Sequence, residues 1–290
     1  MKQVVALAAG VLVAGVVLAQ PSEQHACEDA REASRSGDAV LQATYANCLV
    51  MGALKEPDAL AHARELGRAS MKQGNPIGAY AIYAAFAADP AFSFMVSGKP
   101  DISKYSSLGA LPLESRTEQV EALEALGFAV AKGYPKAMLS LAAYYYETVA
   151  PNNVIRVRNI AALMQKSGLK APYIEQFHKQ GAHVASLGET KASIRAFFDA
   201  QNVAMFTARA AMKKDSAPCE QLKLLHVDSG SLADAVFLPL KAASLRDTYL
   251  VKGSWDETWR FQGCGREASV IVHFWADGWG GAHFTTRITP

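Results

Sequence analysis

Apolar residues recur every three or four positions from Glu23 to Met212, and every second position beyond Asp215. The first pattern is typical of amphipathic helices and the second of half-buried strands. We therefore predict an α+β fold, with a helical-repeat domain at 23–213 and a small antiparallel β domain at 215–290. Gly, Pro and Asn residues break the helical part into four helix pairs and a final longer helix. The predicted helices are 23–35 with 38–53, 57–73 with 77–88, 115–132 with 135–148, 154–167 with 171–186, and 189–212 alone.

Three of the turn glycines, Gly37, Gly74 and Gly133, begin stretches with one common spacing. The side chains at +4, +8 and +12 from each glycine grow from small to bulky, and a fourth glycine, Gly168, continues the series. The separations within the pairs Gly37/Gly74 and Gly133/Gly168 are those of helix-hairpin repeats. The pattern therefore predicts a solenoid of helix pairs. The three sets are Leu41/Tyr45/Leu49, Gly78/Ile82/Phe86 and Ala137/Leu141/Tyr145.

The helix at 189–212 is expected to close this solenoid. A terminal repeat leaves an apolar surface open, and a last helix has to cover it. Ile194, Phe197, Phe198 and Phe206 supply apolar side chains for that role.

Four strand-like segments follow Asp215, each rich in Val, Ile, Thr and aromatic residues. Turn-forming residues at Asp256-Glu257, around Cys264 and around Gly280 separate them. We therefore predict a four-stranded antiparallel meander, with residues 221–227 as a candidate fifth strand. The four segments are TYLVKGSW, ETWRFQG, ASVIVHFWA and AHFTTRI.

Two stretches of the chain are similar to known modules. KQGNPIGAYAIYAAF and AKGYPKAMLSLAAYYYE resemble the second helix of Sel-one-like repeats, relatives of tetratricopeptide repeats, over roughly residues 25–185. The unit from Gly127 fits this pattern well, the Gly74 unit fairly, the Gly37 unit loosely and the Gly168 unit poorly. The resemblance implies a helical solenoid. Some exported bacterial proteins with such repeats are immunity proteins that occlude an antibacterial effector, which makes this role a candidate.

The second resemblance lies in the predicted β domain. The segment from Tyr249 to Phe284 resembles a short β module at the ends of exported bacterial proteins, and this module implies no particular activity. Its recognisable residues are Gly253, Trp255, Glu257, Trp259, Cys264, Gly265, Asp277, Gly280 and Gly281.

The first 19 residues have the features of a secretory signal peptide. Lys2 precedes an apolar run from Val4 to Leu18, and small residues lie ahead of an expected cut before Gln20. The run is too short to span a bilayer, so we expect no membrane insertion after cleavage. The predicted location is periplasmic or secreted. The 29 Lys and Arg nearly balance the 27 Asp and Glu, and this balance gives no electrostatic reason to expect nucleic acid as a partner.

Four cysteines remain after residue 19, an even number that indicates disulfides in an oxidising compartment. Cys27 and Cys48 lie about equally far on either side of the Gly37 turn, where residues of two antiparallel helices come opposite each other. Cys219 and Cys264 then pair by elimination. A zinc site is the weaker interpretation, because no two cysteines have the separation of zinc ligands.

Candidate chemistry is concentrated in the β domain. His273 and His283 flank the turn that contains Asp277, so metal binding or acid–base chemistry is one interpretation. Surface histidines are the favoured one, because no third ligand is evident at fixed spacing. Trp255 and Trp259 share a strand face, and we favour core packing over a sugar-stacking platform. No common hydrolase or kinase motif occurs in the sequence, so we predict no catalytic, cofactor or metal residues.

Candidate partner-binding residues lie in an insertion at 89–114 and on the second helices of the repeats. The insertion is rich in Pro, Gly and Ser and longer than most loops. Its aromatic residues either fill space between repeats, which we favour, or form a binding loop. The candidates are Phe92, Phe94 and Tyr105 in the insertion, and Tyr80, Tyr83, Tyr144 and Tyr146 on the helices.

The sequence therefore favours an exported, non-catalytic scaffold that binds a protein partner, as an immunity or inhibitor-type protein would. The alternative is an enzyme or a cell-wall-binding module whose site lies around Trp255, His273, Asp277 and His283. Fold does not fix function, so both remain hypotheses at this point.

Overall fold

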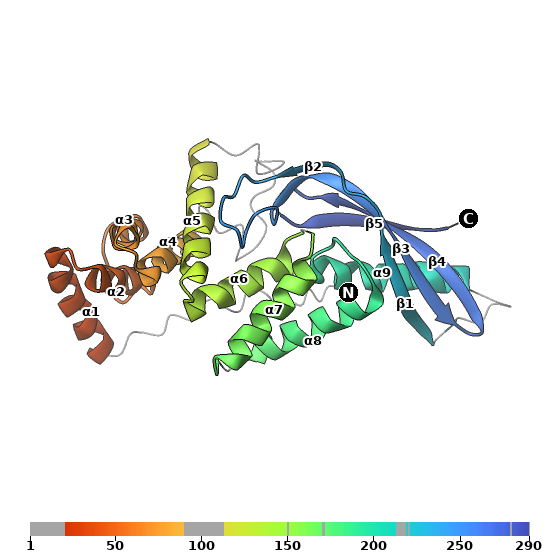
Figure 1. Ribbon diagram of the computed structural model, residues 1–290, viewed down its shortest axis with the longest axis horizontal. Coiled ribbons are helices and arrows are strands. Elements are labelled where there is room, and N and C mark those ends of the chain that lie inside the picture. The colour runs from red at the N-terminus through yellow and green to blue at the C-terminus, as the bar shows by residue number, and fades with distance from the viewer. Residues whose placement is uncertain are drawn as a thin grey trace. The chain divides into compact units, whose positions relative to one another are not determined.

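The computed structural model of the 290-residue chain describes residues 21–89, 113–149, 151–169, 172–212, 219, 221–278 and 280–289 (Figure 1). These residues form nine α-helices and five strands, which confirms the predicted α+β class. They divide into two compact units. The first contains the described residues up to 138 together with 240–245, and the second contains 139–239 and 246–289. The predicted signal peptide at 1–19 lies outside the described residues.

The first unit is helical. It contains α1 (Pro21–Ala33), α2 (Ala39–Val50), α3 (Ala59–Lys72), α4 (Pro76–Ala88), α5 (Leu113–Ala131) and the start of α6 (Pro135–Glu147), with a 3-10 turn at Ser34–Ser36. Each of these helices lies close to its predicted range.

Glycine and capping residues determine where these helices begin. Gly37, Gly74 and Gly133 have φ values of 82°, 86° and 76°, which glycine adopts without the steric penalty of a Cβ atom. Asp38 and Asn75 then cap α2 and α4, because their side-chain oxygens accept hydrogen bonds from backbone N–H groups of the first turn. The repeated glycine therefore marks a turn followed by a capped helix.

The small residue at +4 permits close helix packing, as the repeat pattern suggested. Gly78 on α4 lies against α3, where a Cβ atom added at Gly78 would be 2.4 Å from the Cβ of Ser70. The larger residues of the repeat pattern fill the space further along the helices. Those that are buried are Tyr45, Leu49, Ile82, Phe86, Leu141 and Tyr145.

The second unit combines the end of α6 with α7 (Asn153–Lys166), α8 (Pro172–Leu187), α9 (Ile194–Ala211) and the sheet. The change of sequence pattern near residue 215 therefore marks where helix gives way to strand. The compact unit around the sheet includes helices as well.

Helix α9 packs mainly against the sheet, which the sequence did not predict. Phe197 stacks on Trp259 with 4.6 Å between ring centroids, while Phe198 stacks on His183 of α8. Phe206 is 68 % exposed, so the prediction that it covers the last repeat is wrong. Phe206 follows Phe197 by about two and a half helical turns, which places the two side chains on opposite sides of α9.

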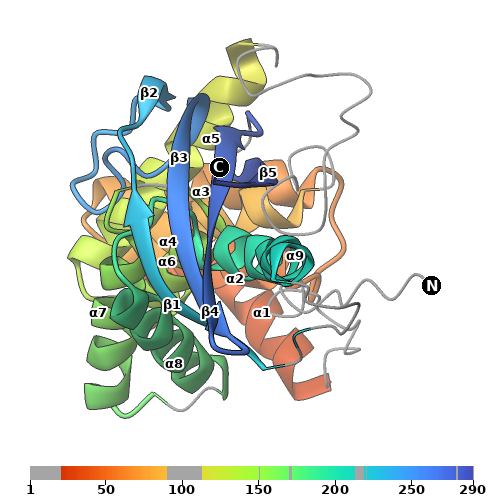
Figure 2. The same ribbon diagram turned by 90° about the vertical axis from the view of Figure 1, so that its right-hand side faces the viewer.

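The sheet is antiparallel, with strands in the order β1, β3, β4, β5 (Figure 2). The second half of β3 pairs with β1, and its first half pairs with β2. The strand bounds are β1 (Leu222–Ser229), β2 (Ala233–Phe237), β3 (Leu250–Gly263), β4 (Arg266–Ala276) and β5 (Ala282–Ile288).

Two details of the predicted meander need correction, while the candidate fifth strand at 221–227 is confirmed by β1. The segments TYLVKGSW and ETWRFQG belong to one strand, since β3 continues through Asp256 and Glu257 without a turn. The short strand β2 was not predicted. Its register with β3 is irregular, Asp234 has a φ of 50°, and its residues do not alternate between buried and exposed.

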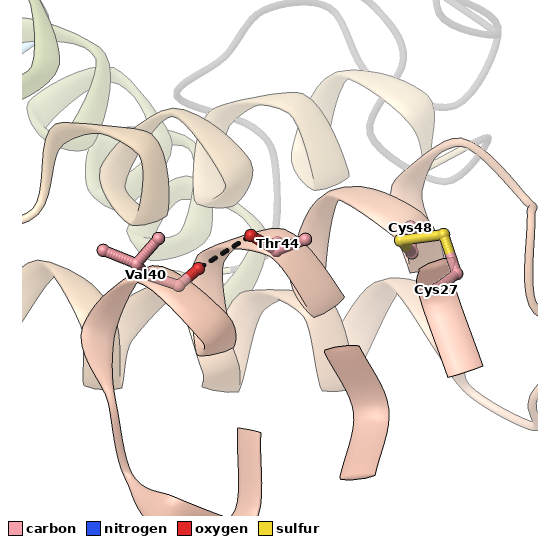
Figure 3. The surroundings of a disulfide bond; sticks show 4 residues. All are labelled: Cys27, Val40, Thr44 and Cys48. Atoms are coloured by element: carbon pink, nitrogen blue, oxygen red, sulfur yellow. Dashed lines mark hydrogen bonds between the residues drawn. A yellow bond between two sulfur atoms is a disulfide. The ribbon is translucent and has the colours of Figure 1, made fainter. Parts of the chain in front are cut away.

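Both predicted disulfides are present. Cys27–Cys48 joins α1 to α2 with 5.8 Å between the Cα atoms (Figure 3). Cys219–Cys264 joins the residues before β1 to the turn between β3 and β4, with 5.9 Å between the Cα atoms. No helix in the described ranges is long and apolar enough to cross a membrane.

Candidate functional site

Strand β3 presents its side chains to two different environments. Trp255, Glu257 and Trp259 are buried on the inner face of the sheet, toward α9, while Asp256 and Arg260 are exposed on the opposite face. This alternation is typical of an antiparallel sheet with one packed and one solvated face. The two faces offer different chemistry.

The inner face contains a fully buried carboxyl group. The Oε1 atom of Glu257 accepts hydrogen bonds from the Trp255 indole at 2.9 Å, the Thr190 hydroxyl at 2.8 Å and the Lys191 backbone N–H at 3.0 Å. Its Oε2 atom accepts one from the Trp259 indole at 3.0 Å. Burial raises the pKa of Glu257, and these hydrogen bonds act in the opposite direction. Glu257 therefore anchors the residues around it inside the unit.

Glu257 holds a loop that covers one edge of the sheet. Gly188 in this loop forms a bridge to Val227 of β1, and a Cβ atom at Gly188 would lie 2.2 Å from the Val227 carbonyl oxygen. The Lys191 ammonium donates to the Ser229 hydroxyl at 3.0 Å and to the Gly230 carbonyl at 2.6 Å. The loop 188–191 and the strand β1 are therefore fixed to each other along this edge.

The same loop borders a pocket of about 200 Å³. Its other wall is formed by residues around the start of α7, including Asn152 and Ile155. The Lys191 ammonium next to this pocket is already bonded to Ser229 and Gly230. We therefore assign no ligand to the pocket.

The solvated face of the sheet, called the outer sheet face below, carries two similar ion clusters. Asp256 contacts His273 at 2.6 Å and Arg287 at 3.8 Å. The ionisable side chains of these clusters are 39–62 % exposed, so the face is available for contacts with other molecules. Ion pairs this exposed contribute little to stability. It consists of His226, Asp228, Asp256, Arg260, His273, Trp275, His283 and Arg287.

The second cluster repeats the first on the neighbouring strands. Asp228 contacts His226 at 2.9 Å and Arg260 at 3.7 Å. Each aspartate thus holds one imidazole and one guanidinium group. Both signs of charge alternate across the face.

Trp275 lies between two histidines on the outer sheet face. Its ring centroid is 5.7 Å from that of His273, which precedes it on β4, and 5.7 Å from that of His283, which is its direct partner on β5. The indole is partly buried. Three rings in a row therefore form the aromatic part of a largely charged surface.

The residues predicted to carry chemistry are only partly brought together. His273 lies opposite Thr285, so Trp275 separates it from His283, and the carboxylate beside it belongs to Asp256. Asp277 instead accepts a hydrogen bond from the Gly281 N–H at 3.0 Å in the β4–β5 turn. Within the part of the chain that the structure describes, no three potential metal ligands cluster.

The tryptophans Trp255 and Trp259 are buried, which confirms the prediction of core packing over a sugar platform. Their indole N–H groups are directed at Glu257 rather than at solvent.

The tyrosines proposed for partner binding are largely part of the internal packing. Tyr83 and Tyr144 are buried, and Tyr80 and Tyr146 are partly buried. The Tyr146 ring stacks on Phe177 with 4.9 Å between centroids. These rings therefore offer little free surface. Phe92, Phe94 and Tyr105 lie outside the described residues.

A polar cluster that the sequence analysis did not identify lies between α1, α2 and α3. Glu56 accepts a hydrogen bond from the Tyr45 hydroxyl and contacts His62 at 3.0 Å and Arg31 at 3.8 Å. The hydrogen bond from Tyr45 is the main cause of the lowered pKa of Glu56. The pKa of Tyr45 is raised to about 12, first by burial and then by its hydrogen bond to Glu56. The cluster fixes the loop before α3 to the first two helices.

Sequence reasoning also missed Trp275, Asp256 and Arg287 as members of one face. The sequence did contain one indication of this face, because His273 and Trp275 are two residues apart and residues two apart on a strand share a face. The alignment of three strands, which brings Asp256 and Arg287 beside them, is not encoded in local spacing.

Comparison with protein families, curated proteins and solved structures gives no match for this chain. Its function has to be argued from the geometry of the two units.

Proposed function

We propose that the protein is an exported, non-catalytic binding protein whose partner is another protein, and that the outer sheet face is its binding surface. The observation that carries this proposal is Trp275, set between His273 and His283 and flanked by the exposed cluster of Asp256 and Arg287. Tryptophan and arginine are enriched among the residues that dominate protein–protein binding energy. A face that combines them with solvated ion pairs has the composition of an interface core and its polar rim.

Charge supports a protein as the partner in preference to nucleic acid. Asp228 and Asp256 balance Arg260 and Arg287 across the face. A phosphate backbone is instead bound by clustered Lys and Arg of one sign.

Two independent features support the proposal that the protein is exported. Both disulfides are expected to persist in an oxidising compartment outside the cytoplasm. The predicted signal peptide at 1–19 agrees with that location. Within the class of exported binding proteins, the resemblance to Sel-one-like repeats favours an inhibitor or immunity-type role.

A capture experiment tests the proposal. The chain from Gln20 onward, immobilised through an N-terminal tag, is exposed to envelope extract from the organism that encodes it. We expect a protein that binds the wild type and Phe206→Ala but is lost with Trp275→Ala. Phe206 is the matched control, since it is an exposed aromatic residue on α9 and not on the outer sheet face. Equal capture by Trp275→Ala would remove the outer sheet face from the proposal.

A cell-wall-binding module is the second candidate, favoured by the row of rings formed by His273, Trp275 and His283. Aromatic rings on a solvated sheet can stack against sugar rings, because both present flat apolar surface. Sedimentation of the protein with purified peptidoglycan, carried out with the same two variants, separates the candidates. Wall binding that depends on Trp275, in the absence of a captured protein, would favour this second function.

A further inference from the structure

The two edges of the sheet differ in how well they are protected from pairing with another strand. On the β1 side, the pairing with β3 is irregular between Leu224 and His226, and the pairing of β2 with β3 is irregular as well. The loop that contains Gly188 and Lys191 is bonded along β1. Bulges and a covering loop are the usual means by which proteins prevent an exposed edge from pairing with another strand.

Strand β5 forms the opposite edge, and among the residues that the structure describes neither a bulge nor a covering loop is found along it. Its register with β4 is continuous from Ala282 to Ile288, without a bulge. Among the described strands, β4 is the only one paired with β5. The β5 sequence AHFTTRI contains no proline, and its inward-facing positions Phe284, Thr286 and Ile288 carry no charge. This edge is therefore regular and long enough to accept another strand.

The hydrogen-bond pattern identifies the backbone groups that face outward. Just beyond the strand, the Thr289 N–H donates to the Ser269 carbonyl at 3.0 Å. Hydrogen-bonded and non-hydrogen-bonded pairs alternate along an antiparallel ladder. Thr285 and Arg287 therefore bond to β4, while the N–H and C=O groups of Phe284, Thr286 and Ile288 point toward the free side.

We propose that β5 accepts an extended segment of the partner protein as an additional antiparallel strand, and that this segment has acidic residues at alternate positions. This inference deepens the proposed function, since it assigns a binding mode to the same sheet. Backbone hydrogen bonds along the edge would supply affinity, and alternate side chains would supply specificity. Ile288, which is 38 % exposed, gives the inner side of the added strand an apolar contact.

Charge on β5 selects the occupant. His283 and Arg287 both project from the outer sheet face, four residues apart and therefore on one side of the strand. Acidic side chains of an added strand would lie beside both. The β5 sequence AHFTTRI contains no acidic residue, so a second copy of this strand would offer Arg287 no carboxylate.

Selection from a phage-displayed library of random decapeptides on the immobilised chain from Gln20 onward tests the inference. We expect enriched peptides with acidic residues at alternate positions. The comparison that decides is between Thr286→Pro and Thr286→Val. Both lose the hydroxyl that contacts Thr207 at 2.7 Å, but only proline removes the outward N–H group. We expect the selected peptides to bind Thr286→Pro about tenfold more weakly than Thr286→Val.

A second position keeps the test decisive if Thr286→Pro does not fold. Ile288 lies at the end of β5, where Ile288→Pro and Ile288→Val form the same comparison. Absence of enrichment, or equal binding to the proline and valine variants, would overturn the inference. So would a dimer of the wild type that Ile288→Pro dissociates, because the occupant would then be a second copy.

The proposed function can fail or survive separately. A natural partner that is lost with Trp275→Ala but retained by Thr286→Pro would leave the outer sheet face as the binding surface and exclude strand addition. A partner retained by Trp275→Ala and lost with Thr286→Pro would support strand addition at β5 and exclude the outer sheet face as the binding surface.

Discussion

The Trp255 indole N–H donates to the Oε1 atom of Glu257, two residues further along β3, at 2.9 Å. Residues two apart on a strand share a face, so this bond connects two side chains on the buried side of the sheet. Trp259, two residues beyond Glu257, donates to the other carboxyl oxygen. The repeated spacing Trp-x-Glu-x-Trp thus encloses one carboxyl group between two indoles.

Glu257→Ala should destabilise the second unit severely. The substitution leaves the indole N–H groups of Trp255 and Trp259 and the backbone N–H of Lys191 buried without an acceptor, at about 1–3 kcal/mol for each group. We expect a loss of at least about 3 kcal/mol in the free energy of unfolding. Urea unfolding followed by tryptophan fluorescence measures it, because all four tryptophans of the chain lie between Trp255 and Trp279.

The control for that measurement is Glu267→Ala. Glu267 is an exposed glutamate on the neighbouring strand β4, so its removal should change the free energy of unfolding by less than about 0.5 kcal/mol. A small effect of Glu257→Ala, similar to that of the control, would mean that Glu257 does not anchor the loop 188–191.

The first unit should lose stability in acid through Glu56. Its pKa is lowered from the ordinary value of 4.5, mainly by the hydrogen bond from Tyr45. A carboxyl group whose pKa is lower in the folded state contributes stability above its ordinary pKa and loses this contribution as the pH falls through the folded value. Tyr45→Phe should therefore cost about 1.5 kcal/mol at pH 7 and progressively less as the pH falls below 4.5.

Circular dichroism at 222 nm during urea unfolding, repeated between pH 7 and pH 3, measures this dependence. Glu56→Gln removes the titrating group and serves as the control, so the pH dependence that is due to Glu56 should be absent from it. A constant difference between wild type and Tyr45→Phe over the whole range would show that the hydrogen bond does not shift the pKa of Glu56.

Removal of the disulfide Cys27–Cys48 should affect the first unit alone. The bridge closes a loop between residues separated by 21 positions, and such a loop is worth about 3 kcal/mol. The double variant Cys27→Ser and Cys48→Ser should unfold its helices at lower urea concentration, while the tryptophan fluorescence transition stays unchanged. A shift of the fluorescence transition by the same amount would instead indicate that both units unfold together.

Much of the fold could be predicted because its determinants are local. The turn at Gly37 and the cap at Asp38 fix the start of α2 within a few residues. That turn also brings Cys27 opposite Cys48, so the first disulfide follows from spacing. The start of α9 was less predictable. It lies at Ile194 and not at residue 189, because Thr190 and Lys191 are held by Glu257, far away in the sequence.

The same distant contact explains the missed continuity of β3. Asp256 and Glu257 are turn-forming by local propensity, but one pairs with His273 across the sheet and the other is buried against the loop 188–191. Tertiary contacts override local propensity at such positions. The outer sheet face was missed for a related reason, since the alignment of β3, β4 and β5 determines which polar residues become neighbours.

Gly78→Ala should destabilise the first unit, although glycine-to-alanine substitutions within helices usually stabilise them. The added Cβ would lie 2.4 Å from both the Cβ and the hydroxyl oxygen of Ser70 on the facing helix. Since a Cβ is fixed to the backbone, α3 and α4 would have to separate, at about 1–3 kcal/mol. Gly181→Ala is the matched control, because the one close contact of its new Cβ is with the Arg158 side chain, at 2.9 Å, while the Val154 carbonyl oxygen lies at an ordinary contact distance of 3.5 Å. Thermal unfolding followed at 222 nm should therefore give a lower midpoint for Gly78→Ala and a small change for Gly181→Ala. An unchanged or higher midpoint for Gly78→Ala would show that the small residue at +4 of the repeat is not required for close helix packing.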